Sequence, residues 1–511
     1  MDTEVFYKKI VNSLKRSKKG AVAADICAST ALPLATVKEL MSKAADEYSG
    51  HLRVTESGEI QYHFPNGFSS RYKSFGAVLK RTIGKTSEIT KKVLKLLFKI
   101  WIMVMLIGYF LIFIALALAT VFIQIAAKSG NNNGGSRGGG LNFNAFDLLW
   151  RIWFVNEVTR PRYGDGYANF RSKNSKPKQP MHKSIFSFVF GEDDPNSNWD
   201  EIKDKAVISY IQTNSGVISL FEYMVFTGDS SSEAEKNILS FCSKFEGSPE
   251  VTEEGAVVYR FDKLLLRSDT AGFSVNIESS AENSWKQRLA GGTLKGINSG
   301  LFPPVKKLKV FSANSKKMNG ILIAINSVNL LFGSYFLYQS FAIGKIIFDR
   351  IEPVIKGLYG SVYYFMNFIM SDPQNFIRIV LGLVPLVFSL LFWIIPAVRS
   401  SLVKKENKKN RLSNFKRFCF SKIFSSPRNI DFDFIEPALK ECCPDDTKEA
   451  ADKVIKDTGA ISNPEIFIAA NGNAIYSFND LEREKQSVEK YRKSINIEKL
   501  QIGKTIFDSN E

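Results

Sequence analysis

Few residues of this 511-residue chain have the types and the spacing that catalysis or metal binding requires. The five cysteines include the adjacent pair Cys442 and Cys443 but no CxxC pair, which argues against a cysteine-type zinc site and a disulfide framework. The three histidines, His51, His63 and His182, are scattered along the chain. Neither the phosphate-binding GxxxxGK(S/T) loop nor the zinc-binding HExxH pattern occurs. We therefore expect a protein that is not an enzyme and that has no cofactor and no metal site.

One acidic run, Glu192-Asp193-Asp194, has carboxylate oxygens that suit calcium or magnesium. Adjacent residues in a turn rarely converge on one ion, however, and the run leads through Asp-Pro-Asn toward a helix expected to begin near Trp199. Side chains of this type commonly accept hydrogen bonds from the free backbone amides at a helix start. We interpret the run as a helix cap, with a cation site as the alternative.

The elements around these residues include four apolar segments, which predict an integral membrane protein. The first has no charged side chain and, at about 1.5 Å per residue, is long enough to cross a hydrocarbon layer about 30 Å thick. The last is interrupted by Pro385, and the turn Asp372-Pro373 before it indicates a helical hairpin. The four segments are 100–127, 318–345, 354–371 and 376–398.

The second apolar segment contains Asn326 and Asn329, whose amide groups lipid cannot satisfy. We expect these side chains to face partner helices of the same chain, with oligomerisation through this segment as a further hypothesis. For the first apolar segment we prefer a simple crossing. The alternative is a run that turns back at Gly108, which would allow all the basic flanks to lie on one side of the membrane.

Positive charge is concentrated beside the apolar segments. The chain has 68 Lys and Arg against 51 Asp and Glu, a net charge of +17. Basic residues at such positions orient membrane proteins and attract anionic headgroups by about 1 kcal/mol each. The pattern predicts anionic lipids as partners, in an inner (cytoplasmic-type) membrane with the N-terminus on the cytoplasmic side. The membrane-surface basic residues are Lys91, Lys92, Lys95, Lys99, Lys306, Lys307, Lys309, Lys404, Lys405, Lys408 and Lys409.

A short sequence pattern occurs three times outside the apolar segments. Residues 54–64 read VTESGEIQYHF, residues 251–261 read VTEEGAVVYRF, and residues 468–478 read IAANGNAIYSF. Each copy has a turn glycine followed by Tyr-x-Phe, an alternation that places both rings on one face of a strand and predicts a β-hairpin. The shared positions are Gly58, Tyr62, Phe64, Gly255, Tyr259, Phe261, Gly472, Tyr476 and Phe478.

Three helices are predicted before each hairpin, and this is the element order of a winged helix. In the first copy, the third helix spans about 34–48, with Val37, Leu40, Met41 and Ala44 at helical spacing. A winged helix reads DNA with its third helix, which then needs an excess of basic residues for phosphate contacts. The three predicted third helices have no such excess. We therefore expect these modules to bind protein rather than DNA.

Winged-helix-like modules are thus expected to alternate with the apolar segments and with four connectors. The expected ranges are 1–66, 199–270 and 399–511 for the modules, the last including a basic segment, and 67–99 (basic), 128–140 (Gly/Asn-rich), 141–198 and 271–317 (basic) for the connectors.

The connector 141–198 combines an aromatic run with a distinctive sequence. Trp150, Trp153 and Phe154 suit a helix that lies in the headgroup region, with docking against the middle module as the alternative. The sequence FSFVFGEDDPN at 186–196 resembles that of an uncharacterised family of bacterial and plastid integral membrane proteins. Members have FSFVFGDGDPN or close variants, followed by a tryptophan-containing helix and a wing that ends in Tyr-x-Phe. The resemblance covers about 141–262 and departs at the acidic run. It implies an architecture without an activity, and a plastid-type membrane as the alternative to the cytoplasmic-type membrane.

We therefore expect a mainly helical membrane protein of α+β class, with about four membrane segments and three winged-helix-like modules. Its predicted function is that of a scaffold or adaptor that holds unidentified protein partners, or copies of itself as a homo-oligomer, at a membrane surface. The alternatives are a membrane-tethered nucleic-acid-binding regulator and a small transporter or channel. The transporter or channel alternative is weakened because few ionisable side chains, which usually mark an ion or proton path, lie inside the apolar segments.

Overall fold

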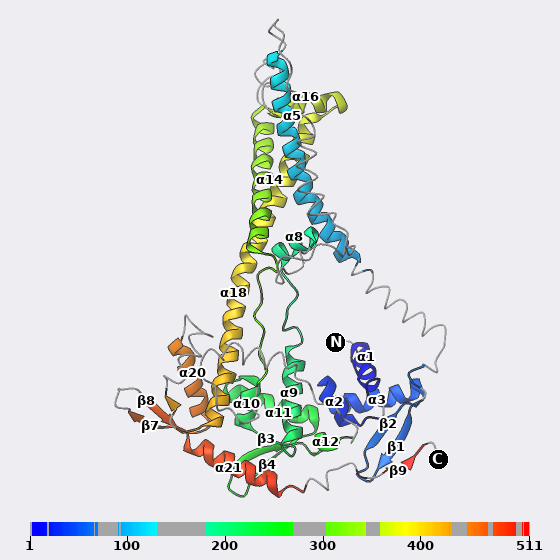
Figure 1. Ribbon diagram of the computed structural model, residues 1–511, viewed down its shortest axis with the longest axis vertical. Helices are drawn as coiled ribbons and strands as arrows, with labels where there is room; N and C mark the ends of the chain where they lie inside the picture. Colours follow the sequence, from blue (N-terminus) through cyan, green and yellow to red (C-terminus); the bar gives the residue numbers. More distant parts are fainter. Residues whose placement is uncertain are drawn as a thin grey trace, which may run out of the picture. The chain divides into compact units, whose positions relative to one another are not determined.

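The computed structural model is mainly helical, and its described residues form three small antiparallel sheets (Figure 1). The expected mainly helical α+β composition is confirmed at this level. The chain divides into two compact units. We call Met1–Leu79, Asp194–Leu308 and Glu406–Glu511 the sheet unit, and Lys80–Asp193 with Lys309–Lys405 the long-helix unit. The described residues are 3–17, 20–65, 67–69, 90, 93–129, 180–268, 303–343, 358–428, 430–431, 447–468, 474–496, 503 and 505–509.

The first module of the sheet unit consists of three helices and a hairpin, at the positions that the sequence predicted. Val37, Leu40 and Met41 are at most 1% exposed on one face of the third helix. Gly58 has a φ of +76° in the hairpin turn, a conformation that glycine adopts without a side-chain clash. An isolated bridge from Ala21 to Tyr62 adds a short extra strand. The elements are α1 (Thr3–Leu14), α2 (Ala23–Thr30), α3 (Leu34–Tyr48), β1 (His51–Thr55) and β2 (Ile60–His63).

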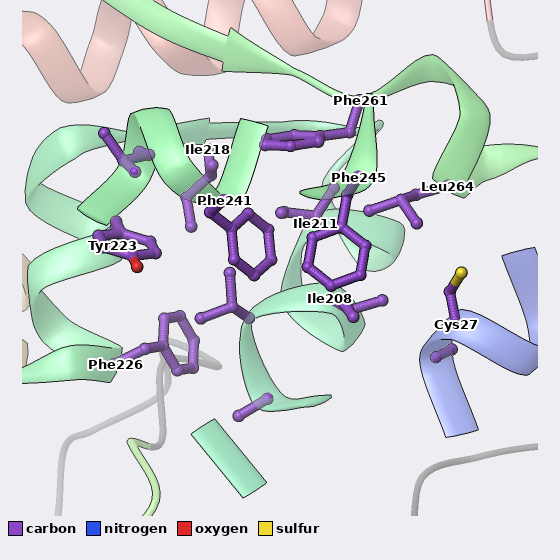
Figure 2. Packing of buried hydrophobic residues seen from close by; sticks show 14 of the residues in the cluster. Cys27, Ile208, Ile211, Ile218, Tyr223, Phe226, Phe241, Phe245, Phe261 and Leu264 are labelled. Atoms are coloured by element: carbon purple, nitrogen blue, oxygen red, sulfur yellow. The ribbon is translucent and has the colours of Figure 1, made fainter. Parts of the chain in front are cut away.

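The second module repeats this element order. A capping box starts its second helix, because the Ser219 hydroxyl accepts the Glu222 amide at 3.3 Å and the Glu222 carboxylate accepts the Ser219 amide at 2.9 Å. Phe241, Phe245 and Phe261 point toward one another in its core (Figure 2). The elements are α9 (Trp199–Thr213), β3 (Val217–Ser219), α10 (Leu220–Thr227), α11 (Ser231–Phe245), β4 (Ser248–Val251), β5 (Val257–Arg260) and α12 (Asp262–Leu265).

The third module has the same strand order as the second. The sheets run β3-β5-β4 and β6-β8-β7, so the short strand pairs with the last hairpin strand in both. In the first module, the bridge at Ala21 takes the place of the short strand. The second of the three helices that the sequence predicts before this hairpin, at 434–442, and the turn at Gly472 lie outside the described residues. The elements are the end of α18 (Val384–Ser425), β6 (Ile430–Asp431), α20 (Thr447–Gly459), β7 (Glu465–Ile468) and β8 (Ala474–Ser477).

One hydrophobic core joins the three modules into a single unit. Phe221 of the second module stacks on Phe424 of the third, with ring centroids 6.2 Å apart. Cys27 of the first module belongs to the same core and is fully buried beside the second (Figure 2). The modules are therefore held together by packing within this unit.

The long-helix unit contains helices that are long and apolar enough to cross a membrane. In the described residues there are three such helices, Val93–Phe122, Lys316–Ala342 and Pro373–Ser425, the last continuing into the sheet unit. Three of the four predicted membrane segments correspond to these helices. Of the fourth, 354–371, the structure describes residues 358–371, where α16 (Leu358–Ile369) has 12 residues, fewer than the roughly 20 that a helical crossing needs. The other elements are η1 (Val104–Gly108), α5 (Tyr109–Ser129), α8 (Met181–Phe190), α14 (Lys316–Ile343), α17 (Pro373–Phe376) and η4 (Ile377–Leu383).

The side-chain amide nitrogens of two asparagines on α14 donate to neighbouring helices, as expected from the sequence. Asn326 and Asn329 are fully buried, and their amides donate to the carbonyls of Ser389 at 3.1 Å and Leu106 at 2.7 Å. Leu106 lies in the π-helical turn η1, and its carbonyl accepts the Tyr109 backbone amide as well as the Asn329 side chain. The helix continues through Gly108 into α5, so the alternative in which this run turns back there is wrong.

Candidate functional site

The C-terminal part of the sheet unit docks on the second module. The helix α21 (Asn479–Ser494) lies along the β3-β5-β4 sheet (Figure 1). Val488 is 2% exposed and packs against Val217 and Val258. Successive strand residues point to opposite faces, and the neighbours of these two valines, Ile218 and Tyr259, belong to the main core. The helix α21 therefore covers the sheet face that the module's own helices leave uncovered.

A buried charged network fixes α21 to this module. The Glu222 carboxylate accepts hydrogen bonds from the Tyr210 hydroxyl and from Arg492, both at 2.6 Å. Arg492 also donates to the Val217 carbonyl at 2.9 Å. The two charged side chains are 2% and 10% exposed, for Glu222 and Arg492 respectively. Because both ions are removed from water, the contact is specific to this geometry.

A second acid lies beside this network. Burial, together with the nearby Glu222 charge, raises the pKa of Glu484 on α21 to about 7, although a hydrogen bond from Ser219 opposes the shift. Glu484 lines a hollow of about 840 Å³ between α21 and the second hairpin, where Glu235 is a further acidic group. At the rim, Lys490 and Glu254 form an exposed ion pair at 2.7 Å.

The end of the described chain docks on the first module. The strand β9 (Thr505–Asp508) pairs antiparallel with β1 and places Phe507 opposite Val54. The Arg53 guanidinium contacts the Asp508 carboxylate at 2.7 Å. The Ser509 amide also donates to the Leu52 carbonyl at 3.0 Å. A segment that follows the third module thus covers the second sheet and extends the first.

The shared hairpin residues lie in the modules' cores rather than on an open surface. Phe261 and Phe478 are fully buried, and Tyr62 and Tyr259 are 6% and 7% exposed. Phe64 and Tyr476 are partly buried against the same core. Gly255, like Gly58, occupies a turn with positive φ. These residues therefore build each module, as the preceding helices led us to expect, and do not themselves form a binding face.

The predicted basic residues do not gather into one site. Lys95 contacts Asp193 at 3.4 Å and Lys99 lies over the Phe186 ring at 4.2 Å, both within the long-helix unit. Lys306 lies 5.1 Å from the ring centre of Trp199 in the sheet unit. Lys309 is partly buried, whereas Lys307 and the four lysines of α18 are exposed. Those four are Lys404, Lys405, Lys408 and Lys409. The predicted basic residues Lys91 and Lys92, and the predicted interfacial aromatic residues Trp150, Trp153 and Phe154, lie outside the described residues.

The FSFVFG sequence forms a docked helix. Ile185, Phe188 and Val189 of α8 are buried against the apolar helices of the long-helix unit. The Arg399 guanidinium donates to the carbonyls of Phe188 at 2.8 Å and Val189 at 3.2 Å, which satisfies the free carbonyls at the helix end. This motif therefore has a packing role.

The acidic run that follows does not cap α9 as expected. The Asp194 carboxylate instead accepts the Asn196 amide at 2.9 Å within a turn, and α9 begins after Asn198 without a side-chain cap. In the described residues, no group of three or more His, Cys, Asp and Glu side chains is arranged to hold a metal.

The docked C-terminal segment was not identified from the sequence. Its helix has few apolar residues, and Val488 and Leu481 alone give little periodic signal. Its strand, Thr505-Ile506-Phe507-Asp508, has the β-branched and aromatic types that could have indicated it. The partners of both are more than 200 residues away, and sequence spacing does not show such contacts.

The chain is similar to one curated protein, an uncharacterised chloroplast protein of Arabidopsis thaliana. The two are 24% identical over 436 residues, which cover 82% of this chain and 73% of the other. No family model matches the sequence. No solved structure matches it either. The similarity agrees with the resemblance to an uncharacterised plastid-type family and describes no activity.

Proposed function

We propose that the chain is a non-enzymatic, membrane-anchored scaffold whose three modules are winged helices that bind protein. The single observation that carries this proposal is the docking of 479–494 on the second module and of 505–508 on the first. One contact adds a helix to a sheet face and the other adds a strand to a sheet edge, and both are recurring modes of peptide recognition. The modules thus have surfaces with the chemistry of protein binding.

The third helices support protein rather than nucleic acid as the partner. On α11, Leu239 is 55% exposed at the centre of the helix, and Glu233 and Glu235 are exposed beside Lys236. On α3, Lys38 is paired with Glu246 of the second module at 3.4 Å. An exposed leucine among charges of both signs suits a protein surface, whereas phosphate contact needs an unpaired positive excess.

The proposed attachment to the membrane rests on the three long apolar helices and on the lysines of α18. Lys404, Lys405, Lys408 and Lys409 follow the apolar part of that helix and are exposed. In this arrangement the helices anchor the chain and the lysines contact anionic headgroups.

Proximity labelling from the native membrane tests the proposal with two variants of α11. Leu239→Asp removes the exposed apolar contact, so we expect the labelled proteins to be lost, whereas Lys236→Ala leaves them in place. Nucleic-acid binding predicts the reverse: Lys236→Ala would weaken DNA or RNA binding by the full chain in nanodiscs and reduce its salt dependence, while Leu239→Asp would not. That second pattern would reject the protein-binding proposal.

A further inference from the structure

Two of the three modules protect the same sheet edge, each in a different way, and the third leaves it open. In each, the first hairpin strand is the outer strand of the module's own sheet. The outer edge of β1 is paired with β9. The strand β4 contains Pro249, which has no amide hydrogen, and Glu250, a charged residue; both discourage a further strand. The strand β7, Glu465-Ile466-Phe467-Ile468, has neither form of protection at its centre.

All four residues of β7 are exposed, and the three that follow Glu465 are apolar. Ile466, Phe467 and Ile468 are 60%, 53% and 81% exposed. Within the described ranges, β8 is the strand that pairs with β7, and the opposite edge of β7 has no strand partner. An exposed apolar edge with free backbone donors and acceptors is a template for another strand.

We propose that this edge pairs antiparallel with β7 of a second copy of the chain. With a net charge of +17, two copies repel each other over most of their surface, so a self-contact must lie where positive charge is absent. Residues 459–468 contain no Lys or Arg, and Glu465 is their one charged residue. A twofold antiparallel pairing about Ile466 and Phe467 places Glu465 opposite an apolar residue, so no like charges meet.

The contact has the size of a weak interface. Four residues per copy bury far less than the roughly 1,200 Å² of a stable complex. Anchoring both copies in one membrane raises their effective concentration, which makes a weak contact sufficient. This self-association supplies one partner for the proposed scaffold but rests on the strand edge alone. Its failure would therefore leave the binding of other proteins untouched.

Energy transfer between donor-labelled and acceptor-labelled full chains in lipid vesicles tests the pairing. Ile468→Lys places a charge at the edge on each copy, and we expect it to lower the association constant by about tenfold or more. Val251→Lys is the matched control, because Val251 is 66% exposed on the equivalent strand β4. We expect that variant to associate like the parent chain. Equal energy transfer for Ile468→Lys and the parent would overturn the proposal.

A photo-reactive phenylalanine analogue at position 467 identifies the contact itself. Cross-linked peptides from the 465–468 segment of a second copy are the expected product. Cross-links to 505–508 would show exchange of the C-terminal strand instead, and cross-links only to foreign proteins would show a different occupant. Either result, or none at all, would reject pairing between two β7 strands. Far-UV circular dichroism equal to that of the parent chain establishes that each variant is folded.

Discussion

The helices α21 and α14 each hold a distant segment through buried polar side chains, but with different chemistry. In the sheet unit, α21 uses the charged pair of Arg492 and Glu222. In the long-helix unit, α14 uses the neutral amides of Asn326 and Asn329, which donate to backbone carbonyls. The second arrangement suits an apolar surrounding, because a neutral amide costs much less to bury than an ion.

The difference between the charged contact of α21 and the neutral contacts of α14 indicates which is more sensitive to the loss of one partner. Removing one member of a buried ion pair leaves the other charge without compensation. Removing an asparagine amide leaves a carbonyl that can relax toward its own helix. The contact of α21 should therefore be the more fragile under mutation, and the following changes test that order.

The largest effect is expected for Arg492→Ala. It leaves the Glu222 carboxylate buried without its cation, and we expect a loss of about 3 kcal/mol in the unfolding free energy of the sheet unit. Urea denaturation of the full chain in nanodiscs measures it. Lys490→Ala on the same helix removes an exposed partner of Glu254 and should leave stability unchanged within error. Equal effects of the two variants would contradict a buried network.

A pH-dependent effect is expected at Glu484. Its folded-state pKa, about 7, lies above the ordinary value of 4.5, so the protonated acid favours the docked state. This contribution is complete below about pH 4.5 and is lost as the pH rises through 7. Glu484→Gln should remove this dependence and should make the docked state about 1 kcal/mol more stable than the parent at pH 8. Hydrogen exchange of α21 between pH 5 and 8, with exposed Glu489→Gln as control, measures it; an unchanged profile would contradict the assignment.

The smallest effect is expected for Asn329→Leu. It removes the hydrogen bond to the Leu106 carbonyl and should cost about 0.6 kcal/mol in the stability of the long-helix unit. Because this amide is used within the chain, we expect the size of the assembly to stay the same. Light scattering of the purified variant measures that size. A smaller assembly would support the hypothesis that this helix also joins copies of the chain.

The modules' elements could be predicted because their signals are local. Val37, Leu40 and Met41 repeat at helical spacing, and Gly58 and Gly255 mark turns that need positive φ. The apolar run before Asp372 was predicted as a crossing because its composition is apolar, and in its described residues the helix from Leu358 to Ile369 is shorter than a crossing needs. Composition predicted an apolar segment there but does not determine where its helix begins and ends.

The docked C-terminal segment could not be predicted in the same way. Glu222 appears in the sequence as an ordinary residue of a first helical turn, and only folding brings Arg492 against it. The open edge of β7 could not be predicted either. The third copy of the pattern predicted a hairpin, but not whether a further strand would pair with its outer strand. Such contacts depend on which long-range surfaces meet, and no spacing rule describes them.

The most direct test of the central claim, that these modules bind protein, uses the chain's own helix as the ligand. The chain truncated after Phe478 is placed in nanodiscs and titrated with a labelled peptide of residues 479–494. Circular dichroism establishes that the truncated chain is folded. We expect saturable binding to the truncated chain, none to the intact chain, and binding weaker by about tenfold or more for the Arg492→Ala peptide. A folded truncated chain that does not bind the peptide, or that binds both peptides equally, would contradict the account.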